Sequence, residues 1–248
     1  MKINPAKSRA IHSWFNSPYY DRLYNHRNEE EAAHFIHSFA SRYPLIPGQQ
    51  VLDLACGKGR YSRQLHQYGL QVTGIDLAGY NISSARRHEQ PGLTFYQADM
   101  REPFAREQFH WVFNMFTSLG YFNSNRENER VIEAAETSLR PGGYLVIDFL
   151  NPHWVKKNLV PHEEKMEAGI NFTVNREIQA DHVYKHISFT DKGERYNFTE
   201  RVQLIHLPEF KTWFRNAGLE WVAVHGDYQL NNYNPDSPRM IMIAKKNK

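Results

Sequence analysis

The chain of 248 residues is long enough for one large α/β domain, and its 41% hydrophobic and 23% charged residues are ordinary for a globular protein. The net charge of +3, from 30 basic and 27 acidic residues without a long Lys/Arg block, makes a nucleic-acid partner unlikely. The single cysteine, Cys56, excludes an internal disulfide framework and fits a reducing compartment, and no apolar leader or membrane-length run occurs, so a cytoplasmic protein is expected.

The first part of the chain, residues 8–45, is rich in aromatic and charged residues and predicts two helices. A turn at Ser17-Pro18 opens the first helix, and apolar residues at helical spacing between positions 29 and 39 form one side of the second. Its aromatic side chains either anchor the helices to a sheet or cover a ligand.

A short apolar run at residues 50–55 predicts a buried strand that breaks into a glycine turn before a helix at 60–67. Such a turn leaves backbone N–H groups at the helix start open to a polar or negatively charged ligand. Asp53 adds a carboxylate that can accept hydrogen bonds from the ligand or from the loop itself. The stretch therefore predicts a nucleotide-type cofactor site.

Two sequence patterns compete for this turn. The dinucleotide fingerprint G-x-G-x-x-G is incomplete, because Ser62 stands where the third small residue is needed. The pattern acid-x-small-x-Gly-x-Gly is complete, and its members are Asp53, Ala55, Gly57 and Gly59.

Acidic residues also follow the next two predicted strands. Residues 70–76 form a strand that ends in Asp76, and residues 93–97 form a strand that Asp99 follows. Neighbouring ends of parallel strands meet at one edge of a sheet, so Asp76 is placed to accept hydrogen bonds from the hydroxyls of a ribose. It could equally cap a helix that begins near Ala78.

The remaining elements continue an α/β alternation with one interruption. Strands are predicted at 109–116 and 144–149, with a helix at 127–139 and a turn at 141–143 between them. Between residues 152 and 208 alternating polar and apolar residues predict antiparallel strands instead, with a turn at 191–193. A helix at 209–217 and strands at 219–224 and 239–244 follow, and the last strand is expected to be antiparallel because no helix precedes it. The three histidines His182, His186 and His206 lack metal-ligand spacing, so no metal is predicted.

These features resemble the class I S-adenosylmethionine-dependent methyltransferases. The resemblance covers residues 48–150 with motifs, including Leu-Arg-Pro-Gly-Gly before the fifth strand, and residues 208–245 with topology alone. It implies a Rossmann-like seven-stranded, mostly parallel sheet with a reversed last strand. It also implies a single methyltransferase domain over residues 1–248, with an N-terminal helical lid at 8–45 and an inserted antiparallel β subdomain at 152–207.

The resemblance also implies which residues contact S-adenosylmethionine. Ala55 stands where the family more often has glycine, and its methyl group leaves the cofactor less room to approach the backbone. The implied set comprises Asp53, Ala55, Gly57 and Gly59 at the methionine part, Asp76 and Leu77 at the ribose, Asp99 and Met100 at the adenine, Phe116 at the end of the fourth strand, and Tyr20 and Arg27 of the lid at the carboxylate.

The reaction implied is transfer of a methyl group to an O, N or C nucleophile of a small molecule. Residues 114–117, Asn-Met-Phe-Thr, depart from the tetrad that methyltransferases of DNA bases or protein amides carry there. No catalytic residue is assigned; Tyr121, Asn151 and His153 lie on loops at the correct end of the sheet. In related methyltransferases such insertions wall the acceptor pocket or join two subunits, so the resemblance implies either role for these strands, the second giving a homodimer. Two alternatives stay open, an NAD(P)-dependent oxidoreductase and a regulatory protein that binds the cofactor without catalysis.

Overall fold

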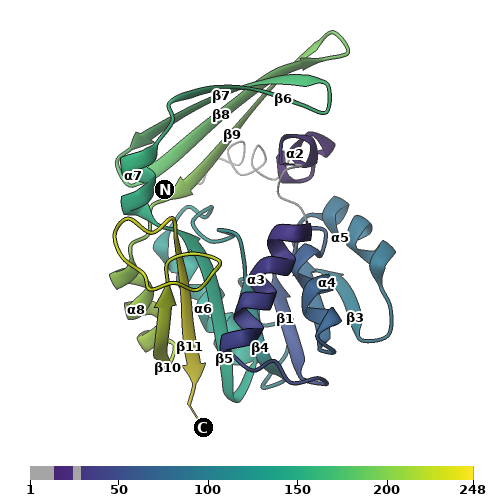
Figure 1. Cartoon of the computed structure of the whole chain (residues 1–248), viewed down its shortest axis with the longest axis vertical. Helices are drawn as coiled ribbons and strands as arrows, with labels where there is room; N and C mark the ends of the chain where they lie inside the picture. Colours follow the sequence, from purple (N-terminus) through teal and green to yellow (C-terminus); the bar gives the residue numbers. More distant parts are fainter. Residues whose placement is uncertain (1–13, 25–28, 248) are drawn as a thin grey trace.

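The alternating elements of the sequence build a seven-stranded main sheet in the computed structural model, which describes residues 14–24 and 29–247 (Figure 1). Its strand order is β10-β11-β5-β4-β1-β2-β3. Strand β11 is antiparallel to both of its neighbours, and every other pairing in this sheet is parallel. The predicted fold class, with its reversed last strand, is confirmed. The strands are β1 (Gln50–Leu54), β2 (Gln71–Asp76), β3 (Leu93–Gln97), β4 (Phe109–Asn114), β5 (Leu139–Leu150), β10 (Leu219–His225) and β11 (Arg239–Lys246).

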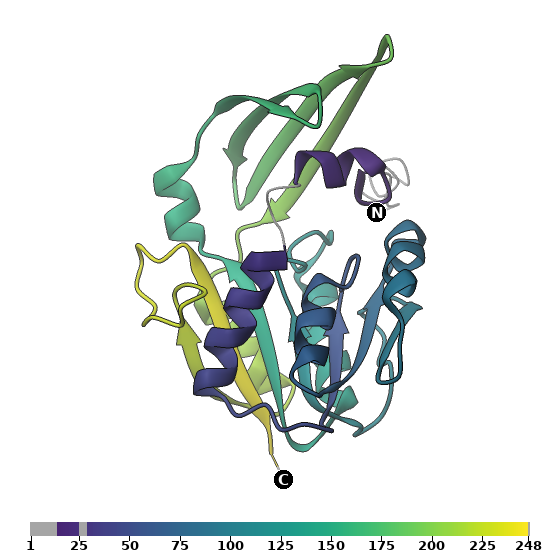
Figure 2. The same cartoon turned by 45° about the vertical axis from the view of Figure 1, so that its right-hand side comes forward.

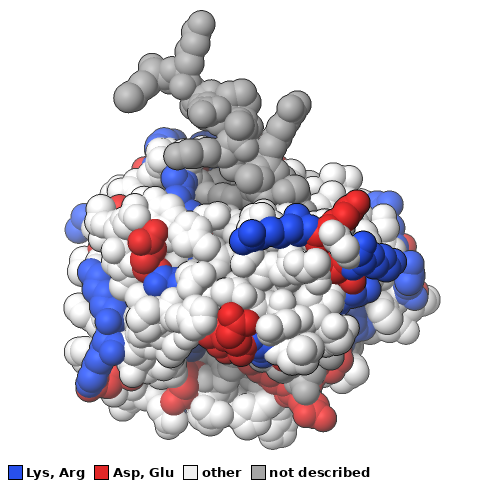
Figure 3. Space-filling view, turned by 90° about the horizontal axis from the view of Figure 1, so that it is seen from above, with Lys and Arg blue, Asp and Glu red and all other residues white. Residues whose placement is uncertain are grey.

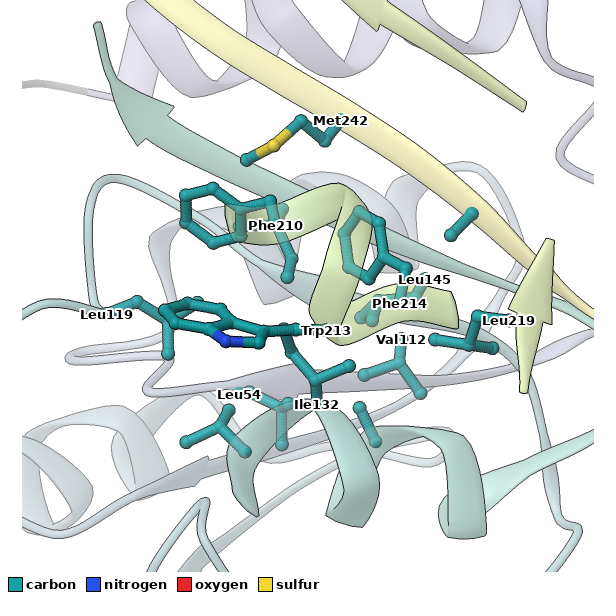
Figure 4. Close-up of a cluster of buried hydrophobic side chains, with 14 of the residues drawn as sticks. Leu54, Val112, Leu119, Ile132, Leu145, Phe210, Trp213, Phe214, Leu219 and Met242 are labelled. Atoms are coloured by element: carbon teal, nitrogen blue, oxygen red, sulfur yellow. The ribbon is translucent and has the colours of Figure 1, made fainter. Parts of the chain in front are cut away.

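Helices cover both faces of the main sheet because its strands are apolar on both sides. Buried residues of α3, α4 and α5 pack on one face, and those of α6 and α8 pack on the other. Figure 4 shows the second core, where Phe210 and Trp213 of α8 and Ile132 of α6 meet Leu145 and Met242 of the sheet. The helices are α3 (Glu29–Arg42), α4 (Arg60–Gln67), α5 (Gly79–Ala85), η1 (Arg86–His88, a 3-10 turn), α6 (Asn125–Ser138) and α8 (Leu207–Asn216).

A second sheet of four antiparallel strands, called the inserted sheet below, lies across the carboxyl ends of the main-sheet strands (Figures 1 and 2). Its strands are β6 (His162–Glu167), β7 (Ile170–Gln179), β8 (His182–Asp191) and β9 (Glu194–Gln203). Lys192 and Gly193 join β8 to β9 with positive φ angles of 51° and 82°, the turn geometry that matches the twist of a hairpin, so the turn predicted there is confirmed.

Two elements of this insertion were not predicted. Helix α7 (Pro152–Asn158) begins after Asn151, whose side chain accepts a hydrogen bond from the His153 N–H. Strand β6 is an edge strand with five polar residues in six, so it carries little of the apolar alternation by which a strand is recognised.

The N-terminal helix α2 (Pro18–Leu23) packs on the inserted sheet rather than on the main sheet (Figure 2). Trp14 and Leu23 share a buried apolar cluster with Phe172 and Ile187 of the inserted sheet, separate from the two cores of the main sheet. The N-terminal segment and the inserted sheet therefore form one packed unit above the strand ends.

One predicted turn is wrong. The turn expected at residues 141–143 lies inside β5, which begins at Leu139. Between the pairs Phe109–Leu139 and Trp111–Tyr144 the register shifts, so the extra residues of β5 form a bulge without ending the strand. Within the described parts of the chain, no helix has the length and apolar character needed to span a membrane.

Candidate active site

A cavity of about 1130 Å³ lies between the carboxyl ends of the main-sheet strands and the inner face of the inserted sheet. Its lower wall is formed by the glycine turn after β1 and by the residues that follow β2, β3 and β4. Its upper wall comes from helices α2 and α7 and from the inserted sheet. Pockets for one small ligand usually hold about 300–1,000 Å³, so this cavity has room for two.

The glycine turn presents its backbone to this cavity. Gly57 has φ 58°, and a side chain there would point into open space, so a ligand can approach the backbone closely. Gly59 has φ 77°, and a Cβ there would lie 2.5 Å from the Phe95 ring, so packing alone demands glycine. Ala55 also has a positive φ, 56°, which explains why glycine is the easier residue at this position.

Asp53 is buried beneath the turn, with 1% of its surface exposed. Its Oδ2 accepts a hydrogen bond of 2.5 Å from Ser62 Oγ. Burial raises the pKa of Asp53 to about 7, although the Ser62 hydrogen bond opposes that shift. Ser62, the residue that breaks the dinucleotide fingerprint, is thus the partner that ties α4 to β1.

Asp76 joins the end of β2 to the glycine turn. Its Oδ2 accepts from the Gly57 N–H at 2.9 Å and its Oδ1 accepts from the Ala78 N–H at 2.7 Å. Burial raises the pKa of Asp76, and these two backbone donors counteract it. The sequence allowed Asp76 to cap the next helix, but the N-cap of α5 is Ala78 and no side chain caps it, so that alternative is wrong. Each Asp76 oxygen keeps a further lone pair for a ligand. The neighbouring Leu77 is 43% exposed and lines the cavity.

Asp99 is held by a residue that sequence reasoning missed. The Arg101 guanidinium donates to both carboxylate oxygens of Asp99 and also to Glu127, at 2.6 Å. Burial raises the pKa of Asp99, but the hydrogen bonds from Arg101 outweigh it and the pKa is lowered. Met100 lies next to Asp99 on the cavity wall, and its sulfur accepts from Asn114 Nδ2 at 3.6 Å.

The chain turns sharply where β4 ends in the cavity. Phe116 and Thr117 have φ angles of 63° and 55°, a pair of consecutive left-handed residues that is unusual without glycine and costly for a β-branched side chain. Asp148, fully buried on β5, holds this turn: its Oδ2 accepts from the Phe116 N–H at 2.9 Å and its backbone carbonyl accepts from the Thr117 N–H.

Arg239 of β11 completes this cluster. Its Nε donates to Asp148 Oδ1 at 2.7 Å and its Nη2 donates to Thr117 Oγ1 at 2.9 Å. Burial lowers the pKa of Arg239, but the charge of Asp148, its hydrogen bond and the nearby Tyr228 together outweigh burial, so the pKa is raised. The guanidinium groups of Arg60 and Arg239 lie 5.4 Å and 5.7 Å from the centre of the Phe116 ring, so this aromatic ring is flanked by two cations.

The N-terminal segment brings aromatic rings to the opposite wall. Tyr20 lines the cavity and packs edge-on against Phe15 at 5.1 Å between ring centres. Phe15 in turn meets Tyr121 of the main domain at 5.2 Å. Arg27, which the resemblance placed at the carboxylate, lies outside the described residues.

The three loop residues considered as bases lie in different environments. Tyr121 lines the cavity. Asn151 is buried and donates to backbone carbonyls of residues 234, 235 and 237, so it holds the C-terminal loop. His153 packs against His206 at 5.2 Å and is not among the cavity-lining residues. Among the residues that the structure describes, no three His, Cys, Asp or Glu side chains are grouped as a metal site.

Comparisons with known proteins agree with this geometry. Residues 51–143 match the family described as a methyltransferase domain. A dTDP-3-amino-3,4,6-trideoxy-alpha-D-glucopyranose N,N-dimethyltransferase of Streptomyces venezuelae is 26% identical over 84% of this chain and 91% of that protein. A ubiquinone biosynthesis O-methyltransferase of Idiomarina loihiensis is 33% identical over 72% of this chain and 65% of that protein. The crystal structure of an S-adenosylmethionine-dependent methyltransferase from Clostridium acetobutylicum superposes with a TM-score of 0.79 at 17% identity, over 93% of this chain and 97% of that one.

The oxidoreductase and non-catalytic alternatives gain no support from these matches, which are all to methyltransferases. The reversed strand β11 and the acid-x-small-x-Gly-x-Gly turn agree with the same family. Together these matches show an S-adenosylmethionine-dependent methyltransferase, which resembles the small-molecule members of class I in sequence and fold.

Proposed function

We propose that this enzyme transfers a methyl group to the amino nitrogen of a small polar acceptor, with an amino sugar as the first candidate. One observation carries the proposal: a single cavity of about 1130 Å³ joins the strand-end carboxylates to the inner face of the inserted sheet. A cofactor at the strand ends would leave the upper part of this space for an acceptor.

One observation favours nitrogen over oxygen. The relative named for N,N-dimethylation of a dTDP-amino sugar aligns over 91% of its length, against 65% for the O-methyltransferase relative. A neutral amine also offers its lone pair to the methyl group without a general base, whereas a hydroxyl acceptor needs one.

We also propose how the predicted residues hold S-adenosylmethionine, which supplies an activated methyl group on a sulfonium when bound. The open space at Gly57 fits a ligand that approaches the backbone, and the remaining lone pairs of Asp76 fit the hydroxyls of a ribose. Asp53 lies beneath the glycine turn and holds the start of helix α4 through its hydrogen bond with Ser62. The full proposed set is Tyr20, Asp53, Ala55, Gly57, Gly59, Asp76, Leu77, Asp99, Met100 and Phe116.

The described part of the lid (residues 8–45) supports a covering role. Its residues Phe15, Tyr20, Asp21 and Tyr24 line the cavity, and Asp21 forms an ion pair with Lys58 of the glycine turn. In this arrangement the lid excludes water from the reacting atoms. The inserted subdomain (residues 152–207) forms the upper wall of the acceptor site together with this lid.

The oligomeric state and the cellular location of the protein stay predictions. A homodimer through the inserted sheet is supported by the exposure of Met166 on its edge strand β6, at 67%, and light scattering of the purified protein tests it. On the face seen in Figure 3, basic and acidic side chains are interspersed among uncharged areas rather than gathered into a basic surface. The cytoplasmic location rests on composition alone.

The test is a matched pair of acceptors. The protein is incubated with S-adenosylmethionine and either dTDP-3-amino-3,4,6-trideoxy-α-D-glucopyranose or its 3-hydroxy counterpart, and products are identified by mass. Methylation of the amine only is expected. Methylation of the hydroxyl compound in preference to the amine would replace the proposal with O-methylation.

A further inference from the structure

The inner face of the inserted sheet changes character along its strands. Toward the turn that joins β8 to β9 this face is apolar, and Phe172 and Ile187 pack beneath helix α2. Toward the main domain the same face lines the cavity and carries two cations and two acids. These four residues are Glu163 of β6, Arg176 of β7, Lys185 of β8 and Glu200 of β9.

The two cations occupy directly opposed positions. Arg176 and Lys185 are register partners in the β7–β8 pair, and both line the cavity. Like charges directly opposite each other on neighbouring strands are destabilising. Such a pair is stable where acidic groups lie close by, whether from the protein or from a ligand.

The acids beside them are engaged in the structure. Glu163 accepts a hydrogen bond of 2.6 Å from Arg176 Nη2. Glu200 is the register partner of Lys185, but its Oε1 accepts from Trp14 Nε1 at 2.6 Å and from the Tyr24 hydroxyl at 2.7 Å, so it serves to attach the N-terminal segment. The hydrogen bond from Arg176 lowers the pKa of Glu163 despite partial burial, and the charge of Lys185 lowers it further.

Lys185 Nζ donates to the Tyr24 hydroxyl, and apolar side chains border the four charged residues. Val183 and Val202 flank them on the inserted sheet, and Trp154 and Val160 line the cavity from helix α7 and the segment after it. Binding pockets of this kind fix the orientation of a ligand with a few charged groups among apolar ones.

We propose that Arg176 and Lys185 bind an acidic group of the methyl acceptor, a phosphate or a carboxylate. The identity of the occupant as acceptor rests on the proposed function, since the cofactor site lies at the strand ends on the other wall. The planar guanidinium of Arg176 matches two oxyanion atoms at once, and Lys185 adds a point charge. The two cations lie on the wall opposite the strand ends, so binding there orients the acceptor toward the cofactor and raises its local concentration.

The experiment measures anion binding directly by calorimetry, with and without S-adenosylhomocysteine. Thymidine diphosphate is the phosphate probe with thymidine as its neutral control, and glutarate is the carboxylate probe with glutaramide as its control. The wild-type protein is expected to bind at least one anion and neither neutral control. Arg176→Gln and Lys185→Gln are each expected to weaken that binding roughly tenfold or more.

Three further variants separate recognition from folding. Glu163→Gln removes the carboxylate that competes for Arg176, so anion binding should tighten, an effect that loss of structure does not produce. Arg176→Lys keeps the charge but loses the paired donors, so it should bind the anion more weakly than the wild type and more tightly than Arg176→Gln. Lys192→Gln, at the hairpin turn of the same sheet, is the matched control and should change nothing.

The proposal is overturned if neither anion binds, or if binding is the same in the wild type and both glutamine variants. Failure of the proposed function has a different signature: anions bind and the variants weaken them, yet no amine is methylated. Conversely, methylation of amines with and without an acidic group at equal KM, together with absent anion binding, removes the subsite and leaves the proposed function.

Discussion

The indole nitrogen of Trp14 donates a hydrogen bond of 2.6 Å to Glu200 Oε1, and so joins the N-terminal segment to strand β9. Both side chains are buried, with 0% and 8% of their surfaces exposed. The Tyr24 hydroxyl donates to the same carboxylate oxygen. The segment that covers the cavity is therefore attached to the inserted sheet, and the two form one wall of the site.

Replacing Trp14 by Phe removes this donor while keeping an aromatic ring in the cluster. The buried charged acceptor then loses one partner, so the free energy of unfolding should fall by about 1.5–3 kcal/mol, in urea denaturation. Trp154→Phe is the control, since Trp154 is 37% exposed, and it should change stability little. Equal effects of the two substitutions would show that the hydrogen bond contributes nothing specific.

Asp76→Asn tests the cofactor site. The amide of asparagine places a donor group against one of the two N–H groups that Asp76 now accepts from, and it removes the charge available to ribose hydroxyls. Affinity for S-adenosylhomocysteine should fall roughly tenfold or more in calorimetry. Asp236→Asn, on an exposed ion pair with Lys157, should bind normally. Unchanged affinity of Asp76→Asn would remove this residue from the cofactor site.

Ala55→Gly should stabilise the protein, contrary to the usual effect of glycine. Ala55 has φ 56°, a conformation that costs an L-residue about 1–2 kcal/mol and costs glycine almost nothing. The extra freedom of glycine in the unfolded chain offsets about 0.5–1 kcal/mol of this gain. Ala40→Gly, inside helix α3, is the matched control and should destabilise by about 1 kcal/mol. Thermal and urea unfolding should show a higher free energy of unfolding for Ala55→Gly and a lower one for Ala40→Gly, each relative to the wild type. A loss of stability in both variants would contradict the prediction.

The buried Asp53 should make stability depend on pH. Its pKa is raised in the folded protein from the usual 3.8 to about 7, so the folded state binds a proton that the unfolded state has released between these values. The contribution of Asp53 to the unfolding free energy therefore falls as the pH rises through this window, and is constant above it. Urea denaturation over this range gives the unfolding free energy of the wild type and of Asp53→Asn. The wild-type value minus the variant value should fall as the pH rises, and a rise of this value with pH would contradict the raised pKa.

Asp148→Asn tests the cluster that holds the turn after β4. It breaks a buried ion pair with Arg239 and places an amide against donors from Phe116 or Tyr228. A loss of about 3 kcal/mol of stability is expected, because Asp148 is fully buried and the largely buried Arg239, 19% exposed, loses its ion-pair partner. The turn after β4 should shift its position without unfolding. We therefore expect kcat to fall by a larger factor than KM rises. Asp236→Asn breaks an exposed ion pair and should cost less than about 1 kcal/mol.

Local signals explain why much of the fold was predictable. The bounds of helix α4 and strand β3 were predicted as the structure has them, at 60–67 and 93–97. Helix α4 follows a glycine turn and ends before Gly69, and β3 follows a Pro-Gly pair, so each boundary is set by neighbouring residues. The carboxylates at or near the carboxyl ends of β1, β2 and β3 were predictable too, because parallel strands bring these ends to one edge.

What the sequence by itself determined is thus the order of the main-sheet elements, the reversed last strand and the glycine turn with its three acids. Only the tertiary structure decided what those acids contact, and it revealed the pairs Asp99–Arg101, Asp148–Arg239 and Trp14–Glu200. The last two pairs join residues 91 and 186 positions apart. Their geometry depends on how whole strands and helices pack, and no local propensity or spacing carries that information.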